Sequence, residues 1–120
     1  MSPPATPIDL DNALNRLGSR VKLLRDMMDM FLEDNQPMLA EIEQAYRNRD
    51  AEAMSRTAHS LKSLVGVFDA TECTAAALAV EQYGNEGDFE AAENGIKILK
   101  AKIALLVEVI ETEREKFAVD

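Results

Sequence analysis

Apolar residues recur along most of this chain at intervals of three and four residues, which is the repeat of an amphipathic α-helix. The longest example extends from Val21 to Tyr46. No run of β-branched residues alternates with polar residues in the way that a half-buried strand requires. The pattern therefore predicts an all-α fold.

Residues that begin and end helices divide this pattern into five segments. We expect helices at residues 10–17, 20–46, 51–68, 70–83 and 89–116. Gly18 should end the first helix, and Pro37 should kink the second or split it, with Asp34 or Asn35 as a new cap. The expected N-terminal caps are Ser19, Asp50, Asp69 (in a capping box with Glu72) and Asp88.

The turns between the four long segments are short, so neighbouring helices should run antiparallel. The economical packing is an up-down antiparallel four-helix bundle with a short extra N-terminal helix. We expect its core to include Phe31, Ile42, Leu61, Val65, Phe68, Leu78, Ile96, Ile103 and Ile110.

Length and charge narrow the class of protein. A chain of 120 residues suits one domain, with residues 1–7 as a Pro-rich linker and residues 8–120 as the bundle. The net charge of -9 argues against nucleic acid and an anionic membrane surface as partners. No apolar run is long enough to span a membrane, and the N-terminus does not resemble a secretory signal. One cysteine cannot form an internal disulfide, so we expect a cytoplasmic location.

The only histidine, His59, lies in the longest acid-free stretch of the chain, between Glu52 and Asp69. The apolar stripe of its helix consists of Met54, Ala58, Leu61, Val65 and Phe68. His59 falls about 140° from the centre of this stripe on a helical wheel, so it should face outward.

The helix surface around His59 carries small side chains and positive charges. Ser55, Ser63 and Gly66 leave open space on it, and Arg56 and Lys62 supply two positive charges. Such a surface suits an anionic group or an acidic partner.

This helix resembles the signature of histidine-containing phosphotransfer (HPt) domains of two-component phosphorelays. The likeness lies in AHSLKS and GVFDA within residues 58–70, where the family has His-x-x-Lys-Gly, then small residues and a Gly-Ala pair. The segments FLED, Val80-Glu81 and Gly87-Asp88 are also similar to the family. Two positions depart from it: Ser63 stands for the glycine after the lysine, and Asp69 stands for the glycine of Gly-Ala.

The resemblance implies that His59 is phosphorylated and that Lys62 stabilises the charge of the phosphoryl group. The group would come from a receiver aspartate or a kinase and pass to a response-regulator receiver aspartate. The implied partners are receiver domains and a sensor or hybrid histidine kinase, with Mg²⁺ on the receiver and no cofactor or metal here. We expect a monomeric phosphocarrier rather than an enzyme, because the chain has no glycine-rich nucleotide loop and no Cys/His metal set. Receiver docking is expected at Ser55, Arg56, Ser63 and Gly66.

Helix geometry adds a candidate partner for the histidine ring. His59 lies ten positions before Asp69 and Glu81 lies twelve positions after it. At about 1.5 Å of rise per residue, both stand at nearly the same level of two antiparallel helices. Glu81 can therefore accept a hydrogen bond from one ring nitrogen, and a polar or acidic residue does this in some HPt-like domains.

Three other interpretations stay open at this point. The chain could be a helical adaptor that docks receiver domains without being phosphorylated. It could be a bundle with no relay role, in which His59 and Glu81 are ordinary solvated side chains. It could also be the HPt module of a larger hybrid histidine kinase, joined to it by the Pro-rich start.

Overall fold

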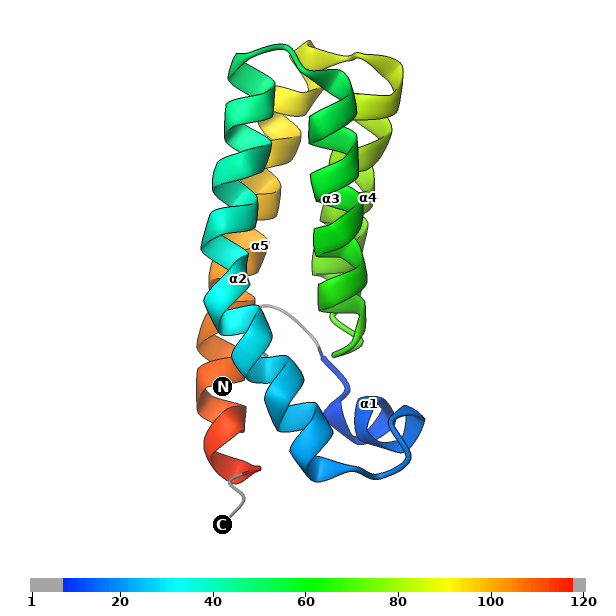
Figure 1. The fold of residues 1–120 in the computed structure, drawn as a ribbon, viewed down its shortest axis with the longest axis vertical. Helices are drawn as coiled ribbons and strands as arrows, with labels where there is room; N and C mark the ends of the chain where they lie inside the picture. The colour runs from blue at the N-terminus through cyan, green and yellow to red at the C-terminus, as the bar shows by residue number, and fades with distance from the viewer. Residues whose placement is uncertain (1–7, 118–120) are drawn as a thin grey trace, which may run out of the picture.

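The computed structural model describes residues 8–117, and within them the chain forms five α-helices and no strand. The helices are α1 (Leu10–Arg16), α2 (Val21–Arg47), α3 (Ala51–Gly66), α4 (Thr71–Glu86) and α5 (Phe89–Lys116). Figure 1 shows α2 to α5 side by side, with α1 at the end where α3 turns into α4. The prediction of an all-α, up-down four-helix bundle with a short N-terminal helix is confirmed. The predicted linker at residues 1–7 lies outside the described residues.

Two of the predicted caps are present. The carboxylate of Asp50 accepts a hydrogen bond from the backbone N–H of Ala53 (3.1 Å), and Asp88 does the same for Ala91 (3.1 Å). Each bond satisfies a backbone donor that has no partner inside its helix. These caps begin α3 and α5 at the predicted positions.

The predicted caps at Ser19 and Asp69 are wrong. Both residues have positive φ, 60° and 54°, so they belong to the preceding turns. The N-cap residues are Arg20 for α2 and Ala70 for α4, and neither makes a side-chain cap. Asp69 and Glu72 therefore form no capping box.

Pro37 does not split α2, which continues without a break to Arg47. Figure 1 shows that the N-terminal part of α2 leans at an angle to the rest, as a proline kink would produce. The side chain of Asn35, only 2% exposed, donates hydrogen bonds to the carbonyls of Phe31 (2.9 Å) and Leu32 (3.1 Å). The side chain of Asn35 thus bonds to the preceding turn of the same helix and does not cap a new one.

Two helix ends differ from the prediction. α3 stops at Gly66, two residues before Phe68. α4 continues through Gly84 and ends where Gly87 takes φ 67°, a left-handed conformation that glycine adopts without strain.

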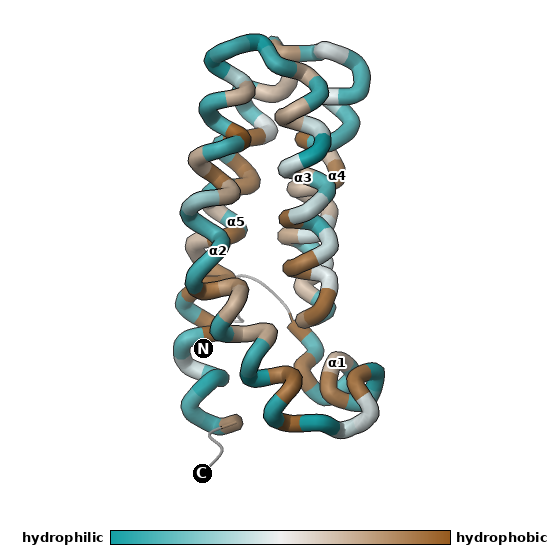
Figure 2. The backbone as a smooth tube through the Cα atoms, in the orientation of Figure 1, coloured by the Kyte–Doolittle hydropathy of each residue, from teal (hydrophilic) through white to brown (hydrophobic). Residues whose placement is uncertain are grey.

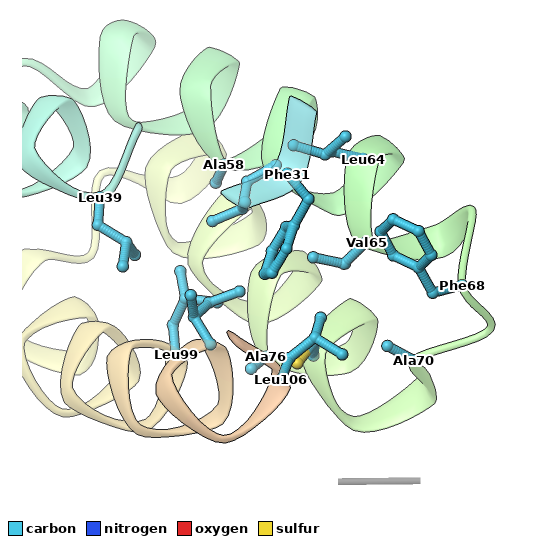
Figure 3. Packing of buried hydrophobic residues seen from close by; sticks show 14 of the residues in the cluster. Phe31, Leu39, Ala58, Leu64, Val65, Phe68, Ala70, Ala76, Leu99 and Leu106 are labelled. Carbon is cyan, nitrogen blue, oxygen red and sulfur yellow. The ribbon is translucent and has the colours of Figure 1, made fainter. Parts of the chain in front are cut away.

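The core follows the predicted faces with one exception. Phe31 and Phe68 are fully buried and meet edge to face, with ring centroids 5.9 Å apart (Figure 3). Leu78 is 38% exposed, so its predicted place in the core is wrong. The buried face of α4 is made instead of smaller residues: Cys73, Ala76, Ala77, Val80 and Gly84. Figure 2 shows that the turns at the opposite end from α1 are mostly hydrophilic.

Gly84 allows α3 and α4 to approach closely. A Cβ atom at this position would lie 2.8 Å from the backbone nitrogen of Ser55 and 3.0 Å from the carbonyl oxygen of Ala51. Neither backbone atom can turn away as a flexible side chain could. The contact between the two helices therefore depends on the absence of a side chain at residue 84.

We expect Gly84→Ala to lower the free energy of unfolding by about 1–3 kcal/mol, because the added methyl group forces α3 and α4 apart. The matched control is Gly66→Ala, since a Cβ there meets nothing within 4 Å. The control should be neutral or stabilising, by up to about 1 kcal/mol, because alanine favours the helix. Urea denaturation of the three proteins measures both effects, and equal stability of Gly84→Ala and the native chain would contradict this role.

Candidate functional site

The structure places His59 on the outer face of α3, with 58% of its side chain exposed. On the opposite face of the helix, Met54, Ala58, Leu61 and Val65 are completely buried. The apolar stripe thus holds α3 against the core in one rotation, and that rotation turns His59 to solvent. The predicted orientation of His59 is confirmed.

One carboxylate, that of Glu81 on α4, contacts two residues of α3. Its Oε2 lies 2.9 Å from Nδ1 of His59, and its Oε1 accepts a hydrogen bond from Nζ of Lys62 at 2.7 Å. His59 and Lys62 are three positions apart on α3, so both reach the same level of α4. The structure therefore shows the contact between Glu81 and His59 that helix register predicts, while the pairing of Lys62 with Glu81 was not foreseen.

The protonation of the ring follows from the state of Glu81. The hydrogen bond from Lys62, above all, holds the pKa of the Glu81 carboxyl below its ordinary value; partial burial opposes this and the bond to His59 assists it. Glu81 is therefore ionised at neutral pH, and an ionised carboxylate can only accept hydrogen bonds. Consequently Nδ1 carries the ring proton, and a neutral ring has its lone pair on Nε2.

A groove between α3 and α4 begins at His59 and extends toward the N-terminus of α3. Besides His59 and Glu81, it is lined by Ser55, Arg56, Ser60 and Asn85, among others. Across the groove, the hydroxyl of Ser55 donates a hydrogen bond to Oδ1 of Asn85 at 2.6 Å. The groove thus has the histidine ring at its edge and a hydrogen bond between side chains of α3 and α4 across it.

The predicted docking residues occupy two sides of His59. Ser55 and Arg56 line the groove, whereas Ser63 and Gly66 lie on the other side, toward the C-terminus of α3. Ser63 is exposed and its hydroxyl donates to the carbonyl of His59 at 3.2 Å. Nothing lies within 4 Å of the place where a Cβ of Gly66 would be, so this side is open. Their role in docking stays a prediction.

Sequence reasoning missed the contribution of α1. Arg16 donates hydrogen bonds to the carboxylate of Asp69 (2.7 Å) and to the carbonyls of Gly66 (3.4 Å) and Val67 (3.3 Å). Asn12 donates to the other oxygen of Asp69 at 2.6 Å. These partners are at least 50 residues apart in sequence, and no local pattern reports such a contact.

Within residues 8–117, no three His, Cys, Asp or Glu side chains gather in a way that could hold a metal ion. In the same part of the chain, no helix has the length and apolar character needed to cross a membrane.

Comparison with known proteins gives a family and two structural neighbours. The family model described as "Hpt domain" matches residues 26–112. Histidine-containing phosphotransfer protein B from Pseudomonas aeruginosa PAO1 has a TM-score of 0.84 at 22% identity, covering 98% of this chain and 100% of that one. The HPT domain of a sensor hybrid histidine kinase from Shewanella has a TM-score of 0.81 at 16% identity, covering 93% and 97%. No curated protein matches the sequence.

We expect Lys62→Met to raise the pKa of the Glu81 carboxyl, because the variant loses the bond that lowers this pKa most while partial burial remains. Carbon-detected NMR titration of the Glu81 carboxyl measures the change. The native pKa is depressed, so the stability from this contact is present above the unfolded pKa and is lost as pH falls through the folded one. That acid loss should shrink in Lys62→Met.

The matched control is Lys100→Met, which removes an ion pair with Glu43 (2.9 Å) elsewhere on the bundle. It should leave the titration of Glu81 unchanged. If Lys62→Met also left it unchanged, Lys62 would not be the group that sets the charge of Glu81.

Proposed function

The chain belongs to the Hpt domain family, the phosphotransfer modules of two-component signalling, and we propose that it carries the phosphoryl group on His59. The observation that carries the proposal is the geometry of this ring. His59 is exposed on a helix of the family bundle, and Glu81 contacts its Nδ1, while no side chain within residues 8–117 hydrogen-bonds to Nε2. His59 is also the only histidine in the chain.

In the proposed transfer, the lone pair on Nε2 attacks the phosphorus of an aspartyl phosphate on a receiver domain. The P–Nε2 bond forms, the P–O bond breaks, and its electron pair leaves with the aspartate carboxylate. The ring then carries a positive charge, which the carboxylate of Glu81 balances through the proton on Nδ1. Lys62 adds positive charge beside the ring, which favours the incoming anionic group. The reverse sequence passes the phosphoryl group to another receiver.

The proposed partners are response-regulator receiver domains and a sensor or hybrid histidine kinase. Phosphoryl transfer consists mainly of positioning and charge stabilisation, so a receiver that brings Mg²⁺ can supply what this surface lacks. We propose that the receiver docks over His59, on the small residues Ser55, Ser63 and Gly66, with Arg56 at the edge.

We expect His59→Gln to abolish phosphorylation without changing the fold, because the side chain is outside the core and glutamine favours a helix. Incubation with a radiolabelled phospho-receiver, followed by acid and base treatment, measures this directly. The native chain should take up a label that is labile in acid and stable in base, as expected for a phosphoramidate bond.

Circular dichroism is the control for folding of His59→Gln. Labelling of a folded His59→Gln protein would place the phosphoryl group on another residue and refute the proposal. A native chain that binds the receiver but takes up no label would instead be an adaptor.

Bulky residues on the docking face should slow transfer more than they weaken folding. We expect Ser63→Trp and Gly66→Arg to slow transfer from a phospho-receiver at least about tenfold, because either side chain holds the receiver away from Nε2. The control is Ala101→Trp, an exposed position on α5, which does not pack against α3. Quench-flow transfer rates distinguish them, and normal rates in both docking-face variants would place the receiver elsewhere.

A further inference from the structure

The groove beside His59 lies on one side of the ring. The groove between α3 and α4 is lined by Ser55, Arg56 and Asn85, but not by Lys62, Ser63 or Gly66. Side chains on an α-helix lean toward its N-terminus, so the ring of His59 extends over the turn that carries Ser55 and Arg56. A group attached to Nε2 therefore has room at the Arg56 end of the site.

Lys62 is already engaged. Its ammonium donates to Glu81 at 2.7 Å, and only 24% of its side chain is exposed. The same carboxylate contacts Nδ1, so Lys62 is bound to the group that contacts the opposite nitrogen of the ring from Nε2. If Lys62 moved to a phosphoryl group on Nε2, it would leave a carboxylate that is itself only 16% exposed.

Arg56 is differently placed. It is the one Lys or Arg among the residues that line the groove, and 66% of its side chain is exposed. Its ion pair with Glu52 is long, 3.5 Å, and Glu52 is 91% exposed. Exposed pairs of this kind contribute little, so Arg56 can leave Glu52 for a stronger anion at small cost.

We propose that Arg56 binds the phosphoryl group on Nε2 of His59 in the α3–α4 groove, while Lys62 acts through Glu81. The proposal rests on the proposed function, because it assigns a residue to the same phosphoryl group. The guanidinium can donate two parallel hydrogen bonds to two phosphoryl oxygens, a geometry that an ammonium cannot provide. Arg56 is then a catalytic residue that contacts the transferred group, and Lys62 is a positioning residue.

The test uses potassium phosphoramidate as the phosphodonor, so that receiver docking does not enter the measurement. In this reaction the P–N bond of the donor breaks, the P–Nε2 bond forms, and ammonia leaves with a proton taken from water. The variants are Arg56→Gln, Arg56→Lys and the control Arg47→Gln. Arg47 is an exposed arginine near the end of α2 that does not line the groove.

We expect Arg56→Gln to take up phosphate about fivefold more slowly than the native chain, and Arg47→Gln to match the native rate. In ³¹P NMR titration of the phosphorylated proteins, Arg56→Gln should raise the pKa of the phosphoryl group, because it removes a neighbouring cation. Arg56→Lys should restore this pKa in part and the uptake rate less, since an ammonium keeps the charge but not the paired hydrogen bonds.

Double-mutant cycles distinguish a direct contact of Arg56 with the phosphoryl group from a general effect of its charge. Glu52→Gln should speed uptake slightly, because it releases Arg56, and should have no effect when Arg56 is already glutamine. Lys62→Met should slow uptake in the native background and have little further effect in Glu81→Gln, since Lys62 acts through Glu81.

The results that overturn the inference are distinct from those that overturn the function. If the native chain is phosphorylated on His59 and Arg56→Gln has the native rate and phosphoryl pKa, Arg56 does not contact the group. If Arg56→Gln and Arg47→Gln changed the uptake rate equally, Arg56 would act only through the net charge of the protein. If neither phosphoramidate nor a phospho-receiver phosphorylates His59 in the native chain, the proposed function itself fails.

Discussion

The close contact between α3 and α4 is the constraint on which the site depends. Gly84 has no side chain, and the backbone of α3 near Ser55 occupies the space that a Cβ would need. The same approach brings a carboxylate of α4 within 2.9 Å of the ring on α3. Wider spacing would weaken the contacts of Glu81 with His59 and Lys62 together, because one carboxylate makes both. Packing and the protonation of the ring are therefore linked through one glycine.

The site is proposed to accept an anionic phosphoryl group although the whole chain has a net charge of -9. Most of its acidic side chains lie elsewhere, and the carboxylate that contacts the histidine ring, that of Glu81, is paired with Lys62. Glu81 can thus fix the proton on Nδ1 without presenting an unbalanced negative charge to an anionic phosphoryl group. A lone carboxylate at this position would hold the ring equally well and repel the group that the ring is proposed to accept.

The sequence predicted those features that depend on a single helix. The apolar stripe from Met54 to Phe68 determines which face of α3 is buried, so the outward position of His59 could be inferred without a structure. The caps at Asp50 and Asp88 are similarly local. Glu81 was predictable because regular helices on either side of a short turn keep a simple register. Family resemblance supplied the chemistry, which helix periodicity alone does not contain.

The predictions were wrong where the local sequence allowed two roles for a residue and the packing of distant segments decided between them. Asp69 looks like a helix cap, but its carboxylate is held by Arg16 and Asn12, and its backbone is left-handed. Aspartate tolerates that conformation better than most residues, so it can occupy this left-handed position of the turn. Leu78 fits the helical spacing of a core residue, yet the face that α4 turns inward is built from smaller side chains.

The turn between α3 and α4 is anchored by the N-terminal part of the chain. Arg16 and Asn12 join α1 to this turn, and the backbone N–H of Asp9 donates to the carbonyl of Phe68 at 3.2 Å. The register between His59 and Glu81 is counted from the same turn, so any slip there would shift the two residues relative to each other. The short N-terminal helix lies at the end of the bundle where α3 turns into α4, and by holding this turn it helps to keep His59 and Glu81 at the same level.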